Sequence, residues 1–180
     1  MWRSAALPLR FAKLHSCDVS SQWIQLNLPS IMTGDLIKYT DSAKQERYDR
    51  AYLKMAREWA KLSHCQRKQV GALIVKNGMI IADGYNGTPS GFENDCEDCD
   101  GDTKWYVLHA EANAITKVAR SNNSAENATL YITLSPCKDC SKLILQVGIK
   151  RVVYMIEYKD DSGLQFLRQA GIELVQIEEP

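Results

Sequence analysis

Residues 151–177 read RVVYMIEYKDDSGLQFLRQAGIELVQI and decide the fold. The apolar runs Arg151–Ile156 and Ile172–Ile177 predict two strands. Between them, Ser162–Ala170 predicts a helix that ends at Gly171. A helical crossover between two strands of one sheet makes them parallel and the connection right-handed, whereas a tight hairpin would make them antiparallel. The stretch therefore predicts an α/β fold whose last two strands run parallel.

The segments upstream supply the rest of the sheet. Asn77-Gly78 is a strong hairpin signal between two short apolar runs, and Gly84–Gly91 is too rich in turn residues for a regular element. The elements expected before residue 151 are a helix from Asp41, strands Val70–Val75 and Met79–Gly84, a helix Val107–Arg120, a strand Ala128–Leu134 and a helix Cys137–Val147. We expect a three-layer α/β/α sandwich around a mixed five-stranded sheet.

The chain divides into an N-terminal extension, residues 1–40, and a folded domain, residues 41–180. In the first 34 residues, three basic residues are offset by Asp18 alone, and the apolar pieces lack a sustained period. This composition predicts a poorly ordered tail. A transit-like peptide and an alternative start at Met32 are the other interpretations.

The first helix of the domain carries an apolar stripe at three- and four-residue steps. Its members are Tyr48, Tyr52, Met55, Trp59 and Leu62. Such a stripe is far more often core than a cofactor site, so we expect it to face the core.

Composition limits the partners and the compartment. The 180-residue chain has 22 basic and 22 acidic residues, so it lacks the overall basic field that holds a polynucleotide. The acidic stretch Glu93–Asp102 would repel phosphates unless a cation sits among its charges. No apolar run reaches the length of a membrane span. Neither nucleic acid nor a membrane is an expected partner.

The six cysteines raise the question of disulfides. Two of them lie in a metal motif and nothing resembles a secretory signal, so we expect reduced thiols in the cytoplasm, which would be the host cytoplasm for a phage-encoded protein. Import into an organelle through the N-terminal segment is the alternative.

Two short motifs hold residues that can bind a metal. His109-Ala-Glu111 opens one predicted helix, and Pro136-Cys137-Lys-Asp-Cys140 opens the next. Helix N-termini favour thiolates, and the C-x-x-C spacing lets two sulfurs reach one ion. The three donors are one short of a closed zinc shell, which is typical of a catalytic site that keeps a position for water.

The order H-x-E…P-C-x-x-C is the signature of zinc nucleobase deaminases, in which the glutamate stays outside the metal shell. Zinc lowers the pKa of its water toward neutrality. Glu111 would accept the water proton, pass it to the ring nitrogen beside the attacked carbon, and carry a second proton to the leaving amine. A redox C-x-x-C pair and a core histidine are the alternatives for the isolated motifs.

Four segments together resemble the deoxycytidylate (dCMP) deaminases, and the phage-type members in particular. They are Cys65-Gln-Arg-Lys-Gln-Val-Gly-Ala-Leu-Ile-Val75, Gly84-Tyr-Asn-Gly-Thr-Pro-Ser-Gly91, His109-Ala-Glu-Ala-Asn-Ala114 and Thr133-Leu-Ser-Pro-Cys-Lys-Asp-Cys140. The zinc motif is common to the whole superfamily, whereas the glycine-rich loop together with Ser-Pro-Cys is the more specific evidence for the dCMP deaminases. The resemblance implies a cytidine deaminase-like fold and zinc-dependent hydrolysis of dCMP to dUMP and ammonia, which supplies dTMP synthesis.

The resemblance also implies roles for single residues. One catalytic zinc per chain would be held by the three donors, with Glu111 as the proton shuttle. Asn86 would hydrogen-bond the sugar, the backbone around Ala110 would contact the base, and Tyr158 would wall the pocket. A turn residue and a core tyrosine are the alternatives for Asn86 and Tyr158.

Phosphate and effector binding need cationic groups. Arg67, Lys68 and Lys159 are candidates for the 5′-phosphate of the substrate. The resemblance implies a homo-oligomer, a hexamer in the favoured case, that dCTP activates and dTTP inhibits, with Mg²⁺ accompanying the effector. The region of Arg67, Lys68 and Gly87 resembles that effector site, and a solvated basic surface is the alternative.

Three further cysteines suggest a second, structural zinc. Some phage-type relatives hold one with cysteines at positions like Cys65 and Cys96, and Cys99 completes a C-x-x-C pair in the acidic loop. The downstream histidines of those relatives are absent, and His64 would be an unusual substitute. Free thiols are the alternative.

Two rival functions remain. A tRNA adenosine deaminase would share the final βαβ unit, but the neutral charge and Ser135, where those enzymes usually have glutamate, argue against it. A zinc-stabilised binding module would leave Glu111 without a role. Free-cytidine deaminases fit less well, because their final strands resemble a hairpin connection.

Overall fold

The computed structural model describes residues 30–178, with side chains from residue 41 onward. The chain divides after Ile37, and the fold described below is that of the second unit. The extension predicted for residues 1–40 lies largely outside the described residues. The elements are α1 Ser30–Ala60, β1 Gly71–Lys76, β2 Met79–Tyr85, α2 Ala110–Ala119, β3 Thr129–Leu134, α3 Lys138–Gln146, β4 Arg151–Ile156, α4 Ser162–Gln169 and β5 Glu173–Gln176.

The sheet has the predicted mixed topology, with five strands in the order β2-β1-β3-β4-β5. β1 is antiparallel to both β2 and β3, and the β1–β2 hairpin turns at Asn77-Gly78, both with positive φ. β3, β4 and β5 are parallel. The crossover through α4 therefore confirms the parallel ending that residues 151–177 predicted.

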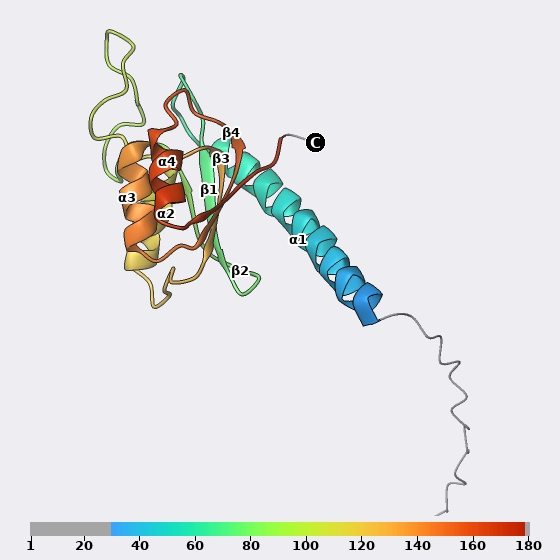
Figure 1. Ribbon diagram of the computed structural model, residues 1–180. Helices are drawn as coiled ribbons and strands as arrows, with labels where there is room; N and C mark the ends of the chain where they lie inside the picture. Colours follow the sequence, from blue (N-terminus) through green and yellow to red (C-terminus); the bar gives the residue numbers. More distant parts are fainter. Residues whose placement is uncertain (1–29, 179–180) are drawn as a thin grey trace, which may run out of the picture. The chain divides into compact units, whose positions relative to one another are not determined.

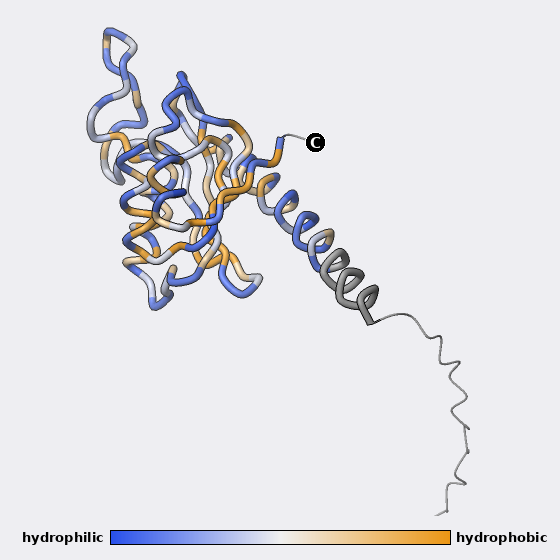
Figure 2. The backbone as a smooth tube through the Cα atoms, in the orientation of Figure 1, coloured by the Kyte–Doolittle hydropathy of each residue, from blue (hydrophilic) through white to orange (hydrophobic). Residues whose placement is uncertain are grey.

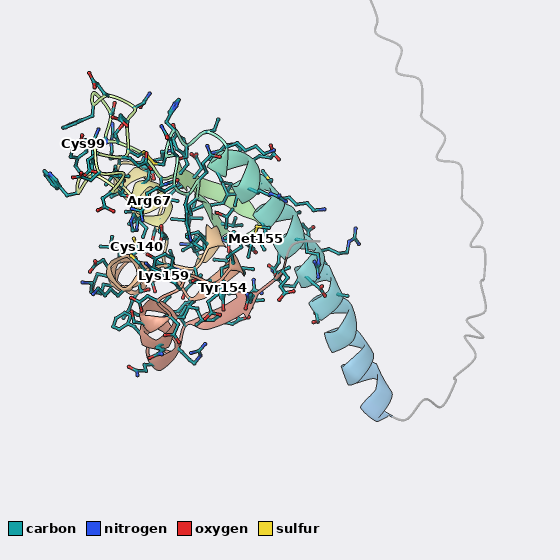
Figure 3. All side chains as sticks on the ribbon, turned by 90° about the horizontal axis from the view of Figure 1, so that it is seen from above. Arg67, Cys99, Cys140, Tyr154, Met155 and Lys159 are labelled. Carbon is teal, nitrogen blue, oxygen red and sulfur yellow. A yellow bond between two sulfur atoms is a disulfide. The ribbon has the colours of Figure 1, made fainter. Side chains whose placement is uncertain are left out.

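Helices cover both faces of the sheet, as expected (Figure 1). α2, α3 and α4 share one apolar cluster with the sheet, whereas residues of α1 join a second cluster on the opposite face. Neighbouring residues of β4 show the division, because Tyr154 belongs to the first cluster and Met155 to the second (Figure 3). Hydrophobic residues gather in the strands between these layers (Figure 2). The three-layer prediction is confirmed.

The first helix differs from its prediction in both its start and its buried face. It begins at Ser30 rather than Asp41. Its core residues are Leu53, Ala56 and Ala60, whereas Tyr48, Met55 and Leu62 of the predicted stripe are exposed. Tyr52 and Trp59 are only partly buried against the core. A Cβ at Gly71 would collide with the carbonyl oxygen of Ala56, so small residues let α1 lie close to β1, and the apolar period did not reveal this.

A buried carboxylate ties α1 to the sheet. Asp49 is 2% exposed and accepts two hydrogen bonds of 2.8 Å from the guanidinium of Arg151. The Tyr131 hydroxyl and the Gln45 amide donate to the same carboxylate. Burial raises the pKa of Asp49, but the hydrogen bonds from Arg151, Gln45 and Tyr131 outweigh it and hold that pKa below its usual value.

Candidate metal centre and substrate pocket

The metal motifs lie where two adjacent helices begin. His109 is the N-cap residue of α2 and Cys137 is the N-cap residue of α3, both with extended backbone. Cys140 lies one turn into α3 and is buried. Two glycines let these helices pack closely against other elements, Gly84 of β2 against α2 and Gly163 of α4 against α3. A Cβ at Gly84 would lie 2.7 Å from the Ala114 nitrogen of α2, and one at Gly163 would lie 2.7 Å from Ser141 Oγ of α3.

The three predicted ligands form one cluster. The Sγ atoms of Cys137 and Cys140 each lie 3.5 Å from His109 Nδ1, and all three donor atoms lie within 4.8 Å of one another. In a tetrahedral zinc site, nitrogen and sulfur ligands are about 3.5 Å apart, given Zn–N of about 2.0 Å and Zn–S of about 2.3 Å. The spacing and chemistry of the donors therefore fit zinc. Among residues 41–178, this is the one cluster of three or more such donors.

The electrostatics of the cluster favour a thiolate. The hydrogen bond from Cys140 and that from His109 lower the pKa of Cys137 to about 4, although burial opposes the shift. The hydrogen bond to Cys137 raises the pKa of His109 to about 8. The same hydrogen bond from Cys140 to Cys137, together with burial, raises the pKa of Cys140. The group therefore holds one negative sulfur ready for a cation.

Glu111 lies beside the cluster without belonging to it. Its side chain is 3% exposed, and burial raises its pKa to about 7 despite the nearby His109. A carboxyl group with a pKa near neutrality can both accept and release a proton, which is what the shuttle role requires.

A cavity of about 290 Å³ opens over these residues. It gathers Asn86, Ala110, Tyr158, Arg67, Lys68 and Lys159 with the metal cluster, so most predicted site residues share one pocket. Figure 3 shows Arg67 and Lys159 on the side of the molecule that holds Cys140. Gly87 does not line the cavity and instead pairs with Leu108 in an isolated bridge. The sequence interpretation missed six lining residues, namely Val70, Glu97, Thr103, Val107, Leu134 and Ser135.

The Asn86 amide is already engaged with the backbone. Its Oδ1 accepts the Val70 N–H at 2.8 Å, and its Nδ2 donates to the Lys68 carbonyl at 2.8 Å. The Oδ1 atom and the Nδ2 group of Asn86 each have one hydrogen-bonding position left, so a hydrogen bond from Asn86 to the substrate sugar stays a prediction. Tyr158 lies at the pocket wall, with Lys68 Nζ 5.3 Å from its ring centroid. The core position considered for Tyr158 is not what the structure shows.

The expectation of reduced thiols is wrong for one pair of cysteines. Cys65 and Cys96 are joined by a disulfide that connects the start of the β1 region to the acidic loop, and both residues are buried. Cys99 is exposed and lies out along that loop (Figure 3). Because two of the three sulfurs are bonded to each other, this pairing does not favour the second zinc, which stays a prediction without support. The resemblance implied that Cys65 and Cys96 lie close together, but as zinc ligands rather than as a disulfide.

The acidic loop also forms hydrogen bonds and an ion pair with Gln66 and Arg67, the two residues after Cys65. The Glu97 carboxylate accepts the backbone N–H groups of Gln66 and Arg67, and the Arg67 guanidinium pairs with Asp102 at 3.2 Å. Arg67 is therefore already partly neutralised.

Within the described residues, no helix is long and apolar enough to cross a membrane.

The sequence matches one family. The model for the cytidine and deoxycytidylate deaminase zinc-binding region matches residues 46–156, more than half of the chain. The chain therefore belongs to the cytidine and deoxycytidylate deaminase family, as its motifs predicted. Its relatives place it on the deoxycytidylate deaminase branch.

Three relatives illustrate the likeness. The deoxycytidylate deaminase of Enterobacteria phage T4 is 39% identical over 64% of this chain and 82% of its own length. That of Saccharomyces cerevisiae is 39% identical over 74% of this chain, which spans only 46% of the yeast protein. The structure of dCMP deaminase from cyanophage S-TIM5, in complex with dCMP and dUMP, aligns with a TM-score of 0.69 and 49% identity, over 71% of this chain and 94% of that one. It has the same fold, which confirms the predicted class.

Proposed function

We propose that this protein hydrolyses dCMP to dUMP and ammonia. The observation that carries the proposal is the convergence of His109, Cys137 and Cys140, with both sulfurs 3.5 Å from the imidazole nitrogen, beside a pocket that the buried Glu111 also lines. The chain's relatives with this activity support the choice of substrate.

The chemistry divides between the ion and the protein. A zinc ion bound by the three donors would activate water as a nucleophile. Glu111 would accept a proton from the attacking water and donate it to the ring nitrogen next to the attacked carbon. It would then carry the second water proton to the departing amine, so that one water and one dCMP yield one dUMP and one ammonia. The backbone at Ala110 lines the pocket where the base would lie.

Two lysines of the pocket suit a phosphate. Lys68 and Lys159 both line the pocket, and neither forms an ion pair with any carboxylate among residues 41–178. Two ammonium groups without an ion-pair partner attract an anion. A 5′-monophosphate supplies that anion, whereas a free nucleoside does not.

Replacing Lys159 tests this phosphate site. We expect Lys159→Met to reduce kcat/KM for dCMP by about 10–100-fold, the size of a lost charge-assisted hydrogen bond. The ratio of the dCMP to the deoxycytidine efficiency should fall, because deoxycytidine has no phosphate to lose. The rates of ammonia release from dCMP and from deoxycytidine give this ratio. Lys150→Met is the matched control, because Lys150 is exposed at the opposite end of β4. An unchanged ratio in Lys159→Met would remove the phosphate assignment.

The same assay separates the rival substrates. Ammonia release from dCMP should exceed that from deoxycytidine, CMP and adenosine-bearing tRNA. Activity on tRNA that weakens steeply with salt would instead indicate a polynucleotide enzyme.

Regulation and assembly are finer parts of the proposal. We propose a homohexamer that dCTP activates and dTTP inhibits, as the resemblance implies. The cleft next to Arg67 is also lined by Asp95, Glu97 and Asp98, so a triphosphate there would require Mg²⁺ to offset the carboxylates. We also propose that residues 41–180 carry the activity and that the enzyme works in the cytoplasm. Rates at low dCMP with and without dCTP and Mg²⁺ test the regulation.

A further inference from the structure

Ser135 is a buried hydroxyl between the metal motif and the loop that carries Lys159. It is 4% exposed and lies two residues before Cys137. Its Oγ accepts the backbone N–H of Tyr158 at 2.8 Å. Its own N–H donates to the Ile156 carbonyl, also at 2.8 Å. The end of β3, which leads to the predicted zinc ligands, is thus hydrogen-bonded to both the end of β4 and the loop after it.

That loop forms one wall of the pocket. Tyr158 and Lys159 are its pocket-lining residues; Ser135 accepts the N–H of Tyr158 itself, and Lys159 is the next residue. Because Lys159 follows Tyr158, the backbone at Tyr158 sets where the Lys159 side chain begins. Within residues 41–178, the Ser135 hydroxyl is the hydrogen-bond acceptor for the Tyr158 N–H, and together with the Ser135–Ile156 hydrogen bond it fixes the start of the loop.

We infer that Ser135 is a positioning residue for substrate selectivity. Its hydroxyl holds the Tyr158–Lys159 loop at the distance from the zinc ligands that suits a nucleoside 5′-monophosphate. The inference rests on the proposed function, because Lys159 matters only if the substrate carries a phosphate. Ser135 does not need to contact the substrate to act in this way.

The test compares substrates with and without the phosphate. We expect Ser135→Ala to lower kcat/KM for dCMP by about tenfold, chiefly through KM, because the Tyr158 N–H loses its acceptor. The efficiency for deoxycytidine should fall less, so the ratio of the two efficiencies should decrease. A purely structural role would lower both efficiencies equally and leave the ratio intact, and that result would overturn the inference.

A second variant isolates the route through Lys159. If Ser135 acts by placing Lys159, then Ser135→Ala should have no further effect on the ratio in a Lys159→Met background. Independent, multiplying effects on the ratio would contradict the inference. Ser135→Cys serves as a milder change, since sulfur is a weaker acceptor of similar shape, and it should give an intermediate ratio even if the alanine variant folds poorly.

The control is another serine hydroxyl that accepts a backbone N–H, at a site that does not line the pocket. Ser121 Oγ accepts the Asn123 N–H at 3.0 Å, so Ser121→Ala removes the same kind of hydrogen bond away from the substrate. The ratio of the dCMP and deoxycytidine efficiencies in this control variant should match that of the wild type. If the wild-type protein turned over no dCMP, the proposed function would be wrong. If it were active but Ser135→Ala left the ratio of the dCMP and deoxycytidine efficiencies unchanged, only the inference about Ser135 would be wrong.

Discussion

Glu111→Gln is expected to reduce dCMP turnover by about 10²–10⁴-fold while the protein keeps its zinc. Glutamine preserves the shape of the buried side chain but cannot accept a proton from water or return it to the substrate. Zinc content should stay at the wild-type level, because the three donor atoms that cluster within 4.8 Å of one another do not include Glu111. Ammonia release and metal analysis on the same preparation measure the two effects together.

The matched control for this change is Glu58→Gln. Glu58 forms an exposed ion pair with Lys61 on the first helix, so its loss should leave both turnover and zinc content intact. If zinc content in Glu111→Gln fell in step with activity, Glu111 would be a ligand, and the proton-shuttle role would be wrong.

Asp49→Asn is expected to lower the free energy of unfolding by about 1.5–3 kcal/mol, since a neutral amide replaces the buried charged acceptor of the Arg151 hydrogen bonds. Arg151, whose side chain is 15% exposed, keeps one charged partner, because its Nε also donates to the exposed Glu173 carboxylate at 2.9 Å. Urea-induced unfolding measures the change. Glu46→Gln on the same helix removes only an exposed pair with Arg50 and should cost less than about 1 kcal/mol. Equal effects of the two substitutions would show that the Asp49 network does not hold the helix to the sheet.

The same network should make stability fall in acid. The pKa of Asp49 is lower in the folded protein than its usual value. The unfolded chain therefore binds the proton at a higher pH than the folded chain does. The stabilisation is complete above the unfolded-state pKa of about 4 and is lost as pH falls through the folded-state value. Unfolding free energies between pH 7 and pH 3 should decline more steeply for the wild type than for Asp49→Asn. Parallel curves would contradict this.

Local patterns predicted the sheet and the metal centre. The crossover at residues 151–177 and the Asn77-Gly78 hairpin each depend on a few neighbouring residues, so their geometry could be derived from the sequence. The same holds for Cys137 and Cys140, which one helical turn brings together. His109 required in addition that the start of its helix lie beside the start of α3, which the packing of both helices on the sheet brings about.

Features that depend on long-range packing could not be predicted. The first helix buries Asp49 and small residues because Arg151 and Gly71 lie opposite, more than ten residues away along the chain. The Cys65–Cys96 disulfide depends on the fold of the acidic loop. In the sequence, Ser135 was informative only as part of the Ser-Pro-Cys motif. Its hydrogen bond with Tyr158 depends on the pairing of β3 with β4.

Zinc K-edge X-ray absorption of the zinc-loaded protein inspects the coordination shell itself. We expect two sulfur ligands near 2.3 Å and two lighter ligands near 2.0 Å, one from His109 and the other from solvent. Addition of a strong competing ligand for the solvent position should change the lighter shell and leave both sulfurs in place. A shell filled by four protein atoms, unaltered by such a ligand, would contradict an ion that activates water beside Glu111.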